Sequence, residues 1–195
     1  RVFNEGFKLK VGDKLIVENN GIIADSNFFR FLSFTLLQGN AGDVLLGPDK
    51  IVLTETLAKR YFGNENPNGR TMLIDGEFTM KVSGVAADCP VNSQIRFDLV
   101  LPVGFLKKRA IDRWQYNLDD GWVGGWPLTY VQLKNPAQRE EVEHQINQVV
   151  GKHAEKEWKH EHKHRDKHRR KVERHYYRDA HRNHYHVDLT EGSMF

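Results

Sequence analysis

Apolar and polar residues alternate near the N-terminus in a pattern that predicts a β-hairpin with one buried face. The alternation over residues 7–11 stops at the turn sequence Gly12-Asp13 and resumes over 15–17. A second hairpin is predicted over 71–85, because its central Asp75-Gly76 pair favours the type I′ turn that joins twisted antiparallel strands. Both patterns indicate antiparallel sheet.

A buried strand that leads into a short helix is predicted in the middle of the chain. Residues 51–53 are uniformly apolar, and Thr54 is a favourable N-cap for a helix from Glu55 to Phe62. Gly63 suits the position just beyond the helix end. Further strands are predicted at 22–24, 97–101 and 128–133, whereas 107–125 has no regular period.

Two more helices are predicted from their capping residues. Asp25 or Ser26 would cap a short helix whose phenylalanines belong to the core. Asn135 would cap a helix with Pro136 in its first turn, and the apolar stripe of this helix is expected to pack on a sheet. The phenylalanines are Phe28, Phe29, Phe31 and Phe34, and the stripe is Val142, Ile146, Val149 and Val150. This succession of elements predicts the α+β class with mostly antiparallel sheets.

The C-terminal fifth of the chain differs in composition from the rest. The net charge is +3, but residues 152–184 carry 12 Lys and Arg against 6 Asp and Glu, which leaves −3 for the remainder. Nine of the ten histidines lie in this segment or just after it. Residues 156–174 have almost no apolar side chains to bury, so we expect a solvated helix or disorder there.

Three histidines at helical spacing suggest weak binding of Zn²⁺ or Ni²⁺. His160, His164 and His168 recur at every fourth position and would share one face of a helix. No second shell of carboxylates or apolar side chains is evident around them, which argues against a strong metal site. A metal-binding or metal-sensing module is therefore the alternative interpretation and not the leading one. Nucleic acid is not an expected partner, because the basic segment lacks interleaved aromatic residues for base stacking.

Two catalytic hypotheses can be formulated and neither is favoured. Residues 160–164 match the H-E-x-x-H pattern of zinc peptidases with Glu161 as the base, but charged neighbours replace the apolar face that docks such a helix. Cys89 could pair with His144 as a nucleophile, yet a lone cysteine after a strand is more often a small packed residue. We therefore expect no catalytic residues.

Other motifs of cofactor binding and membrane insertion are missing. Gly42 and Gly47 have the spacing of a phosphate-binding loop, but Pro48-Asp49 stand where the lysine and hydroxyl are needed. No cofactor is expected. No apolar run approaches the ~18 residues that a membrane span requires. Because the chain begins with Arg1, we expect it to be a segment of a longer protein.

Five segments, in the same order, make the chain resemble the extracytoplasmic core domain of MacB/FtsX-type ABC transporter permeases. They are residues 24–31, 36–40, 51–63, 67–71 and 82–93. The resemblance covers about 20–103 closely and 128–150 more loosely, and it does not extend to 152–184.

The resemblance implies a non-catalytic domain outside the cytoplasm, inserted between the first two transmembrane helices of a permease. It implies a porter-like α/β-sandwich subdomain, 1–24 with 104–195, and an inserted smaller, mostly β lobe, 25–103. A cytoplasmic ATPase, not this chain, would bind ATP, and the membrane helices would transmit its motion to the outer domain. A second permease copy, and a periplasmic adaptor or lipoprotein, are the implied partners.

Overall fold

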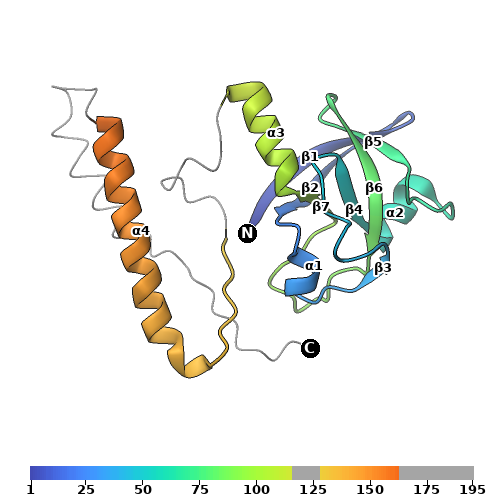
Figure 1. Ribbon diagram of the computed structural model, residues 1–195. Coiled ribbons are helices and arrows are strands. Elements are labelled where there is room, and N and C mark those ends of the chain that lie inside the picture. The colour runs from blue at the N-terminus through green and yellow to red at the C-terminus, as the bar shows by residue number, and fades with distance from the viewer. Residues whose placement is uncertain (116–127, 163–195) are drawn as a thin grey trace. The chain divides into compact units, whose positions relative to one another are not determined.

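The computed structural model describes residues 1–115 and 128–162 of the chain (Figure 1). It forms two units, Arg1–Leu118 and Asp119–Phe195, which are described here one at a time. Helices and strands occur together in the described residues, and the α+β prediction is confirmed.

The first unit is built on a seven-stranded sheet. Its order is β3-β6-β4-β7-β2-β1-β5, and β5 also pairs with β6, so that the sheet closes on itself. The two predicted hairpins supply four of these strands. Five of the seven strand pairings are antiparallel; β2 with β7 and β4 with β6 are parallel. The strands are β1 Val2–Val11, β2 Lys14–Ala24, β3 Leu36–Gln38, β4 Lys50–Thr54, β5 Thr71–Ile74, β6 Phe78–Ala86 and β7 Leu99–Pro102.

The turn between β5 and β6 has the predicted backbone conformation. Asp75 has a φ of 51° and Gly76 a φ of 77°, the two positive values that a type I′ turn requires. Strand alternation then sends Ile74 and Met80 into the core and leaves Thr79 exposed.

Helix α2, Glu55–Phe62, begins and ends as the sequence predicts. The Thr54 side chain accepts a hydrogen bond from the backbone N–H of Leu57 at 3.4 Å. Gly63 follows the helix with a φ of 62°, a conformation that costs glycine little. Leu57, Ala58 and Tyr61 form the face of α2 that joins the core.

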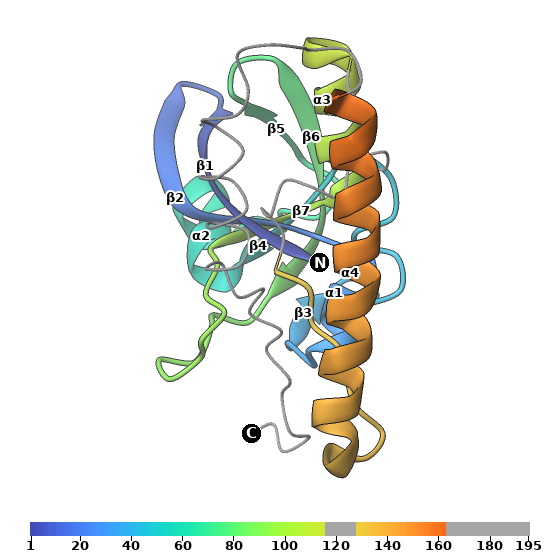
Figure 2. The same cartoon turned by 90° about the vertical axis from the view of Figure 1, so that its left-hand side faces the viewer.

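Helix α3, Val103–Trp114, lies partly where the sequence shows no period, and this expectation is corrected. Its buried side chains begin at 103, four residues before the stretch that looked irregular. Phe105 is 1% exposed and packs edge-to-face against Phe7 and Phe78. Figures 1 and 2 show α2 and α3 on opposite sides of the sheet, and both contribute to one core.

Helix α1, Phe28–Phe31, is present, but the predicted cap is wrong. Asn27 is the N-cap residue, and no side chain caps the helix. The Asp25 carboxylate instead accepts hydrogen bonds from the Arg1 α-amino group at 2.6 Å and from its guanidinium at 3.1 Å. These bonds fix the chain terminus beside the end of β2.

The second unit contains a single-turn 3₁₀ helix, Pro136–Gln138, followed by α4, Arg139–His162. Asn135 caps this start as predicted, because its side chain accepts a hydrogen bond from the Ala137 N–H at 3.0 Å. The predicted strand over 128–133 is wrong: apart from one bridge residue at 128, its backbone is irregular. The expectation that the apolar stripe of α4 packs on a sheet stays a prediction.

Strands from both predicted subdomains share the sheet of the first unit. Residues 21–24 of β2 pair in parallel with β7, which belongs to the predicted 25–103 lobe. The boundaries expected at 24/25 and 103/104 lie at the end of β2 and in the first turn of α3, and the division of the chain at these positions stays a prediction. The assignment of 104–195 to a subdomain with 1–24 stays a prediction.

Candidate functional site

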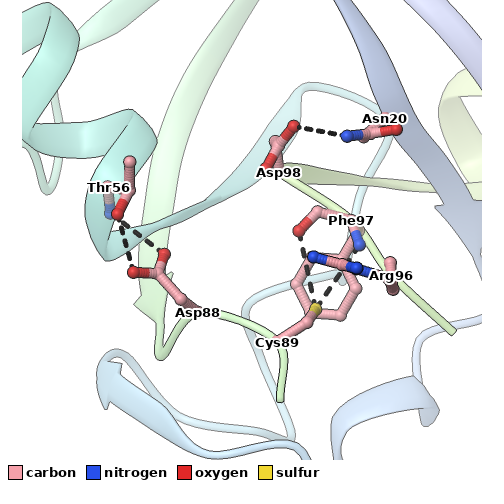
Figure 3. A pocket seen from close by; sticks show the side chains of 7 residues that line it. All are labelled: Asn20, Thr56, Asp88, Cys89, Arg96, Phe97 and Asp98. Carbon is pink, nitrogen blue, oxygen red and sulfur yellow. Dashed lines mark hydrogen bonds between the residues drawn. The ribbon is translucent and has the colours of Figure 1, made fainter. Parts of the chain in front are cut away.

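A polar pocket of about 260 Å³ opens beside the start of α2 in the first unit (Figure 3). The loop between β6 and β7 supplies five of the seven lining residues, and one residue each of β2 and α2 supplies the rest. Its lining residues are Asn20, Thr56, Asp88, Cys89, Arg96, Phe97 and Asp98. The sequence analysis singled out only Cys89 among them as a candidate for chemistry.

Asp88 is bound to the first turn of α2. The backbone N–H of Thr56 donates to Asp88 Oδ1 at 3.1 Å, and the Thr56 hydroxyl donates to Oδ2 at 2.6 Å. Partial loss of water raises the pKa of Asp88, but hydrogen bonds from Thr56 and Thr54 and the charge of Lys59 together hold the pKa below its usual value. The carboxylate is thus an ionised second cap on α2, next to the positive end of the helix.

Asp98 fixes the opposite side of the pocket. Asn20 Nδ2 donates to Asp98 Oδ2 at 3.0 Å, and the Asp98 backbone N–H donates to the Asn20 carbonyl at 2.8 Å. The Thr54 N–H donates to the Asp98 carbonyl at 2.9 Å. These bonds join the middle of β2, the end of β4 and the start of β7, so Asp98 has a positioning role in the sheet.

Cys89 is held as a neutral thiol. Burial raises the pKa of the Cys89 thiol and outweighs the opposite effect of the Phe97 backbone N–H, which donates to the sulfur at 3.4 Å. No histidine lines the pocket. His144 belongs to α4 in the other unit, where its Nε2 lies 2.9 Å from Gln148 Nε2. The described contacts give Cys89 no base that could activate it.

The predicted metal ligands fall largely outside the described residues. His160 lies in the last turns of α4, but its side chain is not described, and His164 and His168 lie beyond the described chain. Within residues 1–115 and 128–162, no three His, Cys, Asp or Glu side chains come together as a metal site. The His160–His164–His168 metal site therefore stays a prediction, as does the H-E-x-x-H hypothesis at 160–164.

Of the four phenylalanines expected in the core near α1, Phe28 and Phe29 are buried, whereas Phe31 and Phe34 are half-buried. Phe28 and Phe34 stack with their ring centroids 5.4 Å apart, and Phe28 meets Phe29 edge-to-face at 5.1 Å. Phe97 joins the cluster from the loop before β7, 5.1 Å from Phe34. Phe97 was predicted only as a strand residue, since no periodicity relates it to α1. The rings pack against one another, and Phe97 connects this cluster to the pocket lining.

Most polar groups of the pocket are engaged within the fold. Both oxygens of Asp88 and one oxygen of Asp98 accept hydrogen bonds from the protein itself. Its thiol is neutral, and Arg96 contributes a solvent-exposed cation. The arrangement braces a loop against α2 and the sheet. Asp88 and Asp98 escaped the sequence analysis because single aspartates in loops carry no periodic signal.

A search for membrane-spanning helices returns none among the described residues.

Three comparisons place the chain among known proteins. The sequence profile of the MacB-like periplasmic core domain matches residues 4–149. The search of curated proteins found no match to this chain. Among solved structures, the periplasmic region of MacB from Actinobacillus actinomycetemcomitans is 20% identical, with a TM-score of 0.49 over 77% of this chain and 66% of that one.

Two further structures have similar folds. A domain described as part of a permease protein from Porphyromonas gingivalis is 20% identical, with a TM-score of 0.48 over 58% of this chain and 53% of that one. The extracellular domain of the ABC-type transporter YknZ from Gram-positive bacteria is 15% identical, with a TM-score of 0.42 over 60% and 59%. The chain thus spans between 53% and 66% of these three structures.

The profile match includes all five segments that carried the resemblance and covers well over half of the chain. It also includes the loop that lines the polar pocket and the first turns of α4. The chain belongs to the family of MacB-like periplasmic core domains, which are parts of ABC transporter permeases.

Proposed function

We propose that this chain is a non-catalytic domain that couples ATP hydrolysis by a cytoplasmic ATPase to a conformational change outside the membrane. The single observation that carries the proposal is the family match over residues 4–149. In this proposal the bound ATP belongs to the partner ATPase, and the domain acts on export of a substrate or on handling of a lipoprotein or peptide. The working unit contains two permease copies.

The architecture of the first unit supports a mechanical rather than a chemical role. The sheet closes on itself, and α2 and α3 fill its interior from two sides with Leu57, Tyr61 and Phe105. Such a close-packed body moves as one piece, because packed interiors resist continuous deformation. The pocket beside α2 offers carboxylates that are already hydrogen-bonded and a thiol without a base.

The location is tested on the full-length gene product in its own membrane. Protease added to spheroplasts should digest this domain while a cytoplasmic marker stays intact, and digestion only after lysis would contradict the proposal. As a matched control, a marker protein is fused to the cytoplasmic side of the predicted first transmembrane helix, where the added protease should not reach it.

The coupling is tested in proteoliposomes that contain the permease and its ATPase. Removal of residues 1–195 should leave ATP hydrolysis measurable but abolish substrate movement. Loss of both activities together, with the complex still assembled, would contradict a coupling role and indicate that the domain is needed for hydrolysis itself.

A further inference from the structure

One face of the hairpin formed by β1 and β2 carries lysines and aliphatic side chains side by side. The register sets Lys8 opposite Val17 and Lys10 opposite Leu15, so these four residues project from the same side of the ladder. We call them the outer hairpin face. Their neighbours along each strand point the other way, and Phe7 and Leu9 lie in the core.

The aliphatic members of this face are exposed well beyond what a core strand allows. Leu15 is 64% exposed and Val17 is 55% exposed. The register continues the face onto β5, where Leu73 pairs with Lys10 and is half-buried. In both views the hairpin tip projects from the rest of the sheet (Figures 1 and 2). Exposed aliphatic side chains that lie next to one another on a strand are a candidate interaction surface.

The charge of the outer hairpin face favours an anionic partner. Lys8 and Lys10 are exposed, and no ion pair engages either ammonium group among the described residues. The Asp75 carboxylate, in the turn between β5 and β6, accepts the Lys8 backbone N–H through Oδ1 at 3.0 Å. Two copies of this face would oppose lysine to lysine, which disfavours self-association.

We propose that the outer hairpin face docks on the anionic surface of a phospholipid bilayer. The ammonium groups of Lys8 and Lys10 would meet lipid phosphates, while Leu15 and Val17 would enter the boundary between headgroups and acyl chains. The inference rests on the proposed function only for the presence of a bilayer beside the domain. Its vesicle test can fail while the membrane topology test succeeds, so the two failures are distinguishable.

The test measures partition of the 195-residue chain onto vesicles of equal parts phosphatidylcholine and phosphatidylglycerol, with pure phosphatidylcholine vesicles for comparison. The variant Lys10→Gln/Leu15→Thr removes one cross-strand pair and keeps residues that suit a strand. We expect its partition coefficient to fall by about fivefold for the lysine and about tenfold for the leucine. Circular dichroism and thermal melting establish that each variant is folded.

The matched control is Lys108→Gln/Ile111→Gln, which removes an exposed lysine and an aliphatic residue that is 53% exposed from one face of α3. It should leave partition unchanged. The basic segment 152–184 is identical in every variant, so a difference between the variants reports on the substituted face. An equal loss in both variants, or no loss in either, would overturn the proposal. If the unsubstituted chain does not bind the phosphatidylglycerol vesicles, the proposal is overturned as well. That result would favour an acidic protein as the partner of the outer hairpin face.

Discussion

The ion pair between Arg109 of α3 and Glu5 of β1 should respond differently to the loss of each partner. Arg109 Nη1 and Nη2 donate to the two Glu5 carboxylate oxygens at 2.8 and 2.6 Å. The arginine side chain is 6% exposed and the glutamate side chain 36% exposed. Arg109 Nε is buried and has no hydrogen-bond partner among the described residues, and the guanidinium lies 5.2 Å from the Phe105 ring centroid. The buried charge therefore belongs almost entirely to the arginine.

Glu5→Gln leaves that guanidinium buried opposite a neutral amide. Breaking a fully buried pair costs roughly 3–5 kcal/mol, and the partial exposure of Glu5 reduces this to about 2 kcal/mol. Arg109→Met removes the buried charge and fills the same space, while water can still reach Glu5. Its cost is about 1 kcal/mol, mainly the lost contact with Phe105. The double variant should be about as stable as Arg109→Met alone.

Urea unfolding of the 195-residue chain, followed by circular dichroism, gives the three free energies of unfolding and their coupling. Arg113→Met is the matched control, because its pair with Glu77 at 2.8 Å is exposed on both sides and should contribute at most about 1 kcal/mol. A larger loss for Arg109→Met than for Glu5→Gln would refute the assignment of the buried charge. Additive single effects would refute the pairing itself.

Three further outcomes are expected. Gly84→Ala should cost about 2 kcal/mol in urea unfolding, since a Cβ would lie 2.8 Å from the Gln38 carbonyl oxygen, whereas Gly151→Ala, in open space on α4, should not destabilise. The folded-state pKa of Asp88 is lowered, so its contribution to stability is present above its unfolded pKa and disappears as pH falls through the folded one; Asp88→Asn should flatten that part of the stability–pH curve. Zinc titration followed by calorimetry should show weak binding that triple His160, His164 and His168→Gln substitution removes; unchanged binding would exclude this site.

Local signals in the sequence were sufficient for the elements of the first unit that they govern. The Asp75-Gly76 turn and the Thr54 and Gly63 caps are each decided by the conformational preference of one or two residues, and the structure has all of them. The cap of α1 failed for a non-local reason: the Asp25 carboxylate is engaged by Arg1, which is distant in sequence. The preference of aspartate for the N-cap position cannot predict that a distant residue binds its carboxylate instead.

Helix α3 shows why a buried charge misleads sequence analysis. Lys107, Lys108 and Arg109 form a basic run that indicates a solvated segment, yet Arg109 points inward to Glu5 and Ala110 is fully buried. The inward stripe only becomes regular when Phe105 and Leu106 are included with Arg109. The pairing of Arg109 with Glu5 spans 104 positions, so no short-range pattern contains it.

The polar pocket and the outer hairpin face lead to opposite conclusions about where function lies. In the pocket, Asp88 and Asp98 satisfy helix and strand ends, so their charge is used within the fold. On the hairpin, Lys10 forms no ion pair with the described residues, and Leu15 is 64% exposed. Full burial of a leucine side chain would stabilise the fold by about 1.5 kcal/mol or more, and an exposed leucine does not contribute this stabilisation. A coupling domain acts through surfaces that meet something else, and this face has both the charge and the apolar area to do so.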